Sequence, residues 1–239
     1  MIRPTHPGLG TYFGLTNQLG FVLNGLKEAE EKQITKVTIG VFNKDIFNVG
    51  YVPFNTIFDL SSIPFEHIKE IDYELELPPN PQTDFALAFN FDPSYCKALQ
   101  FSKEIQDASD RLLSSLPPLT AIIHSKLEKD TFALRKEEDR KNYENDLIKQ
   151  YSVEVDRLPE GNWLLLSHFK HDFWNKFPNV IQPQKMNDNR EISAAIEMCT
   201  ALKLLENPSV HFVYTAGSTF DHLINLKRQE HNPFHVIQL

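Results

Sequence analysis

The segment TAIIHSKLEKD, residues 120–130, changes within a few positions from apolar to charged side chains. Its apolar run predicts a buried strand, and four residues that could do chemistry follow at every second position: His124, Lys126, Glu128 and Asp130. A charge at the end of a buried strand is costly unless a partner neutralises it. Two interpretations follow. In one, this is a surface loop where Lys126 pairs with Glu128 or Asp130; in the other, Lys126 meets a phosphate in an anion pocket and a carboxylate orients it.

Two further segments have the residue types of an anion site. Ligands of parallel α/β folds bind at the carboxyl ends of strands and the N-termini of helices, where backbone N–H groups attract anions. One segment is the glycine-rich loop at residues 8–14, whose end and following helical turn supply Gly14, Asn17 and Gln18. The other is the strand-to-helix turn with Gly217, Ser218, Thr219 and Phe220. An ordinary loop explains the first, which lacks the Gly-Lys-Ser/Thr of a Walker loop, and an ordinary N-cap explains the second.

The sequence around residue 170 invites a metal interpretation, because His168, His171 and Asp172 lie close together. Histidines three apart can share a helix face, but a third ligand beside these two would have to come from a distant part of the chain. Four aromatic residues favour a packed aromatic cluster instead: Trp163, Phe169, Phe173 and Trp174. No Asp-X-Asp occurs between the strands, so we expect no metal site. Ser167 and Ser218 lack the spacing of a nucleophile elbow.

Strand and helix patterns alternate along the chain and predict an α/β fold with parallel sheet and helices on both faces. The expected helices are 15–31, 97–116, 136–150, 190–205 and one capped by Ser218 or Thr219; the expected strands are 36–42, 70–77, 84–91, 119–124, 162–168 and 210–216. Two prolines at 117 and 118 end the second helix. We place a domain boundary there, which gives domains 1–117 and 118–239 with a ligand cleft between them.

The composition narrows the class of protein. The chain has 239 residues, of which 41% are hydrophobic, and carries a net charge of −8. This charge argues against broad nucleic-acid or membrane-surface binding but leaves room for a local basic pocket. The two cysteines, Cys96 and Cys199, are expected to be buried thiols rather than a disulfide or a zinc site. No signal peptide or membrane-spanning run is visible, so we expect a soluble chain, cytoplasmic by default.

Four segments occur in an order that resembles a known family. They are Gly14-Leu15-Thr16-Asn17-Gln18, then VPFNTIFDL at 52–60, then HSKLEKD at 124–130, then VYTAGSTF at 213–220. Together they resemble the GDP-fucose protein O-fucosyltransferase family, especially its plant-type branch, over residues 8 to 226. In that family the third segment reads His-Leu-Arg with Glu and Asp behind it.

The resemblance implies two Rossmann-like domains facing across a cleft, as in GT-B-type glycosyltransferases, with the acceptor side in 1–117 and the nucleotide-sugar side in 118–239. It implies a metal-independent, inverting transfer of fucose from GDP-fucose to a hydroxyl of a protein or glycan, with no cofactor besides this donor. Carried across, the catalytic group is Lys126, His124 and Glu128, with Lys126 on the β-phosphate. The implied donor-binding residues are Gly14, Asn17, Gln18, Asp130, Gly217, Ser218, Thr219 and Phe220.

Two departures from the family pattern keep alternatives open. Lys126 stands where the family has an arginine, and an ammonium cannot form the bidentate fork that suits a diphosphate. Only residues 1–5 precede the glycine loop, so we expect a trimmed N-terminal domain. The hypotheses are therefore an active fucosyltransferase, a catalytically inactive relative that binds a nucleotide sugar or glycan or acts as a structural partner, and an unrelated α/β enzyme.

Overall fold

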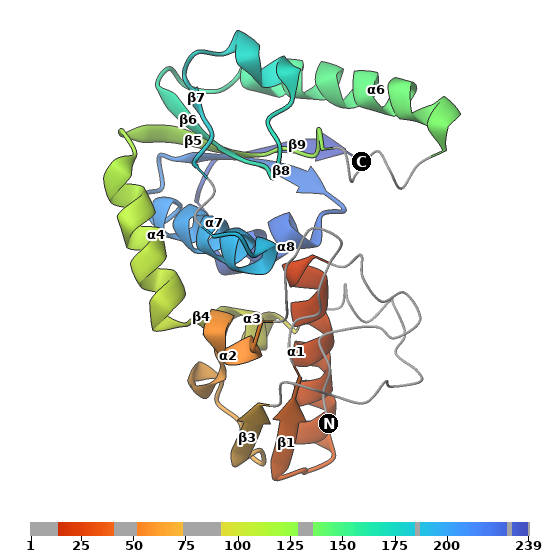
Figure 1. Cartoon of the computed structure of the whole chain (residues 1–239), viewed down its shortest axis with the longest axis vertical. Coiled ribbons are helices and arrows are strands. Elements are labelled where there is room, and N and C mark those ends of the chain that lie inside the picture. The colour runs from red at the N-terminus through yellow and green to blue at the C-terminus, as the bar shows by residue number, and fades with distance from the viewer. Residues whose placement is uncertain are drawn as a thin grey trace. The chain divides into compact units, whose positions relative to one another are not determined.

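The computed structural model describes residues 14–40, 52–73, 92–128, 136–184, 187–228 and 231–238 (Figure 1). Asp130, the predicted strand 84–91 and most of the glycine loop lie outside these residues. The chain divides into two compact units, Met1–Asp110 with Lys185–Cys199, and Arg111–Gln184 with Thr200–Leu239. Two of the three divisions, after Asp110 and after Cys199, fall within helices α4 (Lys103–Ser115) and α7 (Arg190–Leu204). The domain boundary at Pro117–Pro118 stays a prediction.

The second unit is built on a five-stranded parallel sheet, which confirms the α/β class. Its strands are β5 (Leu119–His124), β6 (Asn162–Leu166), β7 (Val180–Ile181), β8 (His211–Ala216) and β9 (Phe234–Gln238), in the spatial order β7-β6-β5-β8-β9. From β5 the chain proceeds to β6 and β7 on one side, and it then returns to build β8 and β9 on the other. The strand order therefore reverses between β5 and β8, and the carboxyl ends of strands at such a reversal are where open α/β sheets bind ligands.

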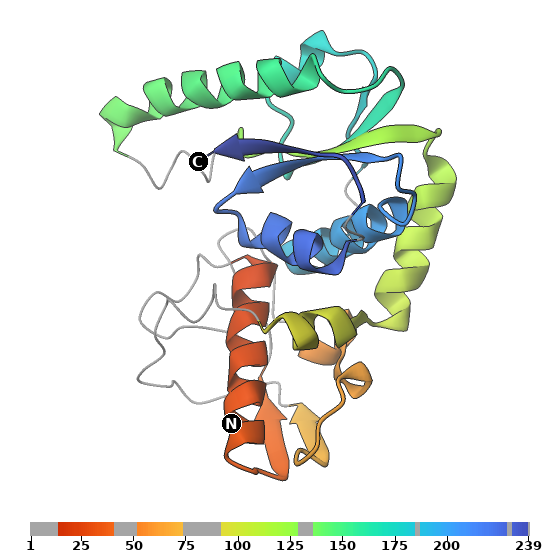
Figure 2. The same ribbon diagram turned by 180° about the vertical axis from the view of Figure 1, so that it is seen from behind.

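Helices cover both faces of this sheet. Helix α6 (Glu137–Val155) lies on one face and α8 (Thr219–Lys227) on the other, as the two opposite views show (Figures 1 and 2). The face under α6 holds a buried core to which β5 contributes Ala121 and Ile123. Because side chains alternate along a strand, His124 at the end of β5 is directed to the opposite face, toward α8.

The first unit contains the N-terminal helix and two small sheets. Helix α1 (Leu15–Glu31) has the predicted bounds, and its predicted apolar stripe is buried: Leu15, Leu19, Val22, Leu26 and Ala29. Strands β1 (Lys36–Ile39) and β3 (Glu70–Tyr73) pair in parallel. The remaining elements are α2 (Phe54–Ile57), β2 (Phe58–Asp59), the 3-10 turn Leu60–Ser62, α3 (Pro93–Ala98) and β4 (Gln100–Phe101). Among the described residues, no helix combines the length and the apolar character needed to cross a membrane.

The predicted helix 97–116 is wrong at its start. The structure has α3, then β4, and begins α4 only at Lys103. The cause is tertiary pairing, because the Ser102 N–H donates to the carbonyl of Ile57 at 2.8 Å and the Ser102 hydroxyl to the carbonyl of Thr56 at 2.6 Å. These bonds, with the antiparallel pairing of β4 to β2, outweigh the helical periodicity of the sequence.

The carboxylate of Glu30, near the end of α1, holds the chain that enters β3. It accepts hydrogen bonds from the backbone N–H groups of Glu66, His67 and Ile68. Burial disfavours the charged form of Glu30, but these donors and the His67 ring outweigh it and lower the pKa of the carboxyl. An ionised Glu30 therefore positions β3 beside β1.

We predict that Glu30→Gln lowers the melting temperature at pH 7 and has a smaller effect below pH 4. The folded-state pKa lies below the unfolded value of about 4.3. The stabilisation is therefore complete above that value and is lost as the pH falls through the folded-state pKa. Scanning calorimetry at both pH values measures the difference. Glu28→Gln, which removes an exposed pair with Lys32 on the same helix, is the control and should change little; an equal loss at both pH values for Glu30→Gln contradicts the prediction.

Candidate functional site

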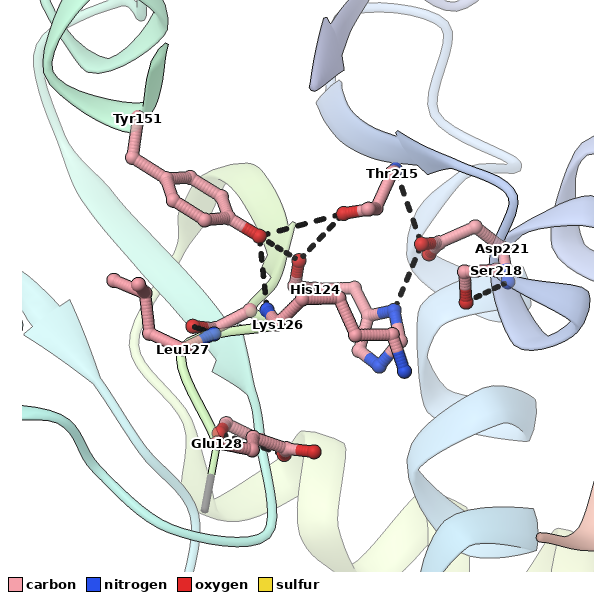
Figure 3. A network of polar contacts seen from close by, with 10 residues as sticks. His124, Lys126, Leu127, Glu128, Tyr151, Thr215, Ser218 and Asp221 are labelled. Atoms are coloured by element: carbon pink, nitrogen blue, oxygen red, sulfur yellow. Dashed lines mark hydrogen bonds and ion pairs between the residues drawn. The ribbon is translucent and has the colours of Figure 1, made fainter. Parts of the chain in front are cut away.

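Among the described residues of the second unit, a buried side-chain contact joins His124 to Asp221. Nδ1 of His124 lies 2.8 Å from Oδ2 of Asp221, and the two residues are 7% and 0% exposed. The same oxygen accepts the backbone N–H of Thr215 at 3.0 Å. The imidazole ring also packs against Phe220, with ring centroids 4.6 Å apart. The ring is thus held between α8 and the end of β5 (Figure 3).

Sequence reasoning missed Asp221. It lies three residues after Ser218, which caps α8 as predicted and accepts the Asp221 N–H at 3.4 Å. An acid at this distance from a capping serine is the pattern of a capping box, in which the acid bonds back to the cap. Here the carboxylate reaches strand β8 and His124 instead. The available signal was this Ser-X-X-Asp spacing directly after a buried strand.

A buried tyrosine fixes the backbone on the α6 side of the site. The hydroxyl of Tyr151 donates to the carbonyl of His124 at 3.0 Å and accepts the N–H of Lys126 at 2.9 Å. It also lies 3.3 Å from Oγ1 of Thr215. Burial raises the pKa of the Tyr151 hydroxyl, so this group keeps its proton and can donate. The hydroxyl thereby connects α6, the end of β5 and strand β8.

One interpretation of the sequence pairs Lys126 with Glu128. In the structure these two residues have different environments. Oε1 of Glu128 accepts the hydroxyl of Ser167 at 2.9 Å and the N–H of His168 at 2.6 Å, and the residue is 5% exposed. Glu128 therefore holds the loop that follows β6. Lys126 is half-buried, and no described carboxylate lies within ion-pair distance of its ammonium group. The expected Lys126–Glu128 pair does not form.

The turn after β8 lies beside the contact between His124 and Asp221. Gly217 is exposed and has a φ of 83°, a left-handed conformation that favours glycine. Ser218 is buried as the N-cap, Thr219 is half-buried, and Phe220 is the residue that packs against His124. The structure thus brings the predicted residues His124, Lys126 and 217–220 to the carboxyl ends of the adjacent strands β5 and β8.

The other predicted residues belong to the first unit. Gly14 caps α1, and a side chain there would meet no atom within 4 Å. Asn17 is half-buried, with its N–H bonded to the Gly14 carbonyl at 3.1 Å. Gln18 is 1% exposed, and its Nε2 donates to Oε1 of Glu191 at 3.3 Å. A donor role for Gly14, Asn17 and Gln18 stays a prediction.

The segment around residue 170 is mainly aromatic packing. Phe173 and Trp174 are stacked edge to face at 4.8 Å, and Phe177 contacts both of these rings and Trp163. This agrees with the predicted cluster except at Phe169, which is 41% exposed. His171 lies 3.0 Å from Glu144. Within the described ranges, no three His, Cys, Asp or Glu side chains are grouped as a metal site. Both cysteines are buried free thiols, as predicted.

No protein-family model matches the sequence, and no curated protein matches it. The fold is similar to a crystal structure of POFUT1 in complex with GDP, with a TM-score of 0.59 and 11% identity over 98% of this chain and 96% of that one. It is also similar to NodZ alpha-1,6-fucosyltransferase soaked with GDP-fucose, with a TM-score of 0.52 and 13% identity over 93% and 94%. A structure of POFUT1 with GDP-fucose aligns at a TM-score of 0.40 over 74% of this chain and 57% of that one. The first two of these likenesses show that the chain has a fucosyltransferase-like fold.

We predict that Tyr151→Phe destabilises the protein by about 1–3 kcal/mol, because it leaves the Lys126 N–H without its acceptor. Urea unfolding followed by circular dichroism measures the change. Tyr214→Phe on β8 is the matched control, since its half-buried hydroxyl has no hydrogen-bond partner among the described residues. This control should stay within about 0.5 kcal/mol of wild type; an equal effect of both variants would show that the Tyr151 bonds contribute nothing.

Proposed function

We propose that this chain binds GDP-fucose and transfers fucose to a hydroxyl of a protein or glycan, with inversion and without a metal. The observation that carries the proposal is the position of His124 and Lys126, at the strand ends where the sheet order reverses. The likeness of the fold to GDP-bound POFUT1 and to NodZ supports the choice of donor. In this proposal residues 118–239 serve the donor and residues 1–117 the acceptor.

The charges at these strand ends suit a nucleoside diphosphate. Helix α8 begins at Thr219, two residues after the exposed Gly217 and directly after its N-cap Ser218, so the positive end of its dipole lies next to the turn. Lys126 adds an ammonium that no described carboxylate neutralises. We infer that the diphosphate lies between Lys126 and residues 217–219, where Ser218 and Thr219 contact phosphate oxygens.

The same arrangement would assist the reaction. The acceptor hydroxyl oxygen forms a bond to C1 of fucose while the bond between C1 and the β-phosphate oxygen breaks. GDP departs with the bonding electrons, and the hydroxyl proton passes to the departing GDP or to water. Negative charge therefore grows on the diphosphate in the transition state. A fixed cation at that point stabilises the transition state more than the ground state. Lys126 takes this role in the proposal, with His124 beside it.

A second candidate is a catalytically inactive relative that binds the nucleotide sugar or a glycan. The observation that favours it is Lys126 itself, which stands where the family it resembles has arginine. Lysine lacks the planar fork that engages two phosphate oxygens at once. Each 1.36 kcal/mol of lost transition-state stabilisation slows the reaction about tenfold, so binding could persist where turnover does not.

We predict that GDP and GDP-fucose raise the melting temperature of the wild-type chain, because a ligand of the folded state stabilises it. Lys126→Ala should weaken GDP binding about tenfold or more, through loss of a charge-assisted contact. Lys103→Ala is the control, since Lys103 is an exposed lysine paired with Asp107 on α4. If neither nucleotide shifts the melting temperature, the proposal is wrong.

Activity separates the two candidates. We expect GDP release from GDP-fucose to depend on an added acceptor and Lys126→Arg to raise the turnover, because the guanidinium restores two parallel donors. A coupled assay of GDP, with peptide and glycan acceptors, measures both. Tight GDP binding without turnover, in wild type and in Lys126→Arg, would instead favour the inactive relative.

A further inference from the structure

One oxygen of the buried Asp221 carboxylate has no hydrogen-bond partner among the described residues. Asp221 is 0% exposed, and its Oδ2 is bonded to His124 and to the Thr215 N–H. Its Oδ1 is buried and has no hydrogen-bond partner within the described residues. A buried anion with one unpaired oxygen is costly unless a cation lies against it. In direct contact with this carboxylate, the side chain that can take a positive charge is the imidazole of His124.

The contact also decides which part of His124 a ligand would meet. Because Nδ1 faces the Asp221 carboxylate, it must carry a hydrogen, and Nε2 is left on the other side of the ring. Within the described part of the chain Nε2 has no partner. The ring cannot turn away without losing both the carboxylate and its packing against Phe220.

The other charged and titratable groups around the ring do not compete for this contact. From α6, the Tyr151 hydroxyl is bonded to the His124 carbonyl rather than to the ring. Glu128 is bonded to the loop after β6. Lys126 follows two residues later, and Figure 3 shows its side chain on the same side as the His124 ring and directed away from the Tyr151 hydroxyl. Asp221 is therefore the carboxylate in contact with the ring, and the side chain of Lys126 lies on the same side as the ring.

We propose that Asp221 is a positioning residue that keeps His124 protonated, so that Nε2–H of His124 and the ammonium of Lys126 together bind the diphosphate in place of one guanidinium. This inference rests on the proposed function. It assigns a role to Asp221, which lies outside the four segments that carry the resemblance. Two separate donors, each charged, then contact the oxygens that an arginine fork would contact. The buried charge of Asp221 balances the added imidazolium.

A different role for the same pair has the opposite dependence on pH. A neutral His124 could act as a general base on the acceptor hydroxyl, oriented by Asp221 as in a catalytic triad. In that role, acid would abolish turnover, and GDP binding would not depend on Asp221. In the role proposed here, protonation strengthens binding of the diphosphate. Binding measurements across pH therefore distinguish the two.

The test measures dissociation constants of the full chain for GDP and for inorganic pyrophosphate from pH 5.5 to 8.5, by calorimetry. Asp221→Asn keeps the size of the side chain but removes its charge. We expect it to raise the dissociation constants of both probes about tenfold near pH 7, as the loss of one charge-assisted hydrogen bond would. The ratio to wild type should shrink toward pH 5.5, because acid protonates His124 in the variant as well. Taking the ratio cancels the titration of the phosphate itself.

The matched control is His235→Asn. Nδ1 of His235 lies 3.0 Å from Oε2 of Glu154, which is another histidine–carboxylate pair in the same unit. This variant should leave the binding profile unchanged. Should Asp221→Asn fail to fold by circular dichroism, His124→Gln replaces it. The binding defect of His124→Gln relative to wild type should grow as the pH falls from 8.5, because only wild type gains an imidazolium.

The outcomes separate this inference from the proposed function. A pH-dependent defect with both probes supports the inference, and the same defect with pyrophosphate alone supports it while the GDP-sugar assignment fails. A defect that is constant across pH shows a merely structural role and overturns the inference. Unchanged binding with lost turnover also overturns it and assigns the pair to base catalysis. Absence of binding to either probe by wild type overturns both proposals.

Discussion

The bond between the buried Asp221 carboxylate and His124 is the constraint on which the geometry of the site depends. It joins the last residue of β5 to the first turn of α8, and the same carboxylate binds the backbone of β8. Two elements almost a hundred residues apart in the sequence are thereby fixed at the one place where the sheet order reverses. A ligand bound there would meet a His124 ring whose position is already set, so little ordering entropy of this side chain is lost on binding.

This constraint is supported from the other face of the sheet. Tyr151 reaches from α6 to the backbone of His124 and Lys126, so the strand end is held from both faces. Glu128 then ties the chain beyond it to the loop after β6. As a result Lys126 is carried on a backbone with little freedom, although its own side chain is long and flexible. Rigidity of this kind is what places a charged group reliably at a reacting centre.

Local patterns in the sequence were enough to predict much of this framework. The apolar stripe of α1, the buried run of β5 and the Ser218 cap each involve neighbours in sequence, and the structure confirms all three. The break before Lys103 was not predictable in this way, because it depends on bonds from Ser102 to residues more than forty positions earlier. Sequence reasoning also missed strand β9. Its five residues form a strand through their parallel pairing with β8, and this pairing cannot be seen in the local sequence.

Asp221 shows the same limit within the site. Its spacing from Ser218 is that of an ordinary helix cap, and only the pairing of β5 with β8 brings His124 within reach. The result bears on Lys126, which stands where the family that the sequence resembles has arginine. A flexible lysine loses about 2 kcal/mol of rotamer entropy when it is fixed, whereas His124 is already fixed by Asp221 and Phe220. In the proposed site, a rigid His124 ring beside the flexible side chain of Lys126 would supply the directional contact that the ammonium alone lacks. This division of roles depends on the contact of the ring with the buried Asp221 carboxylate.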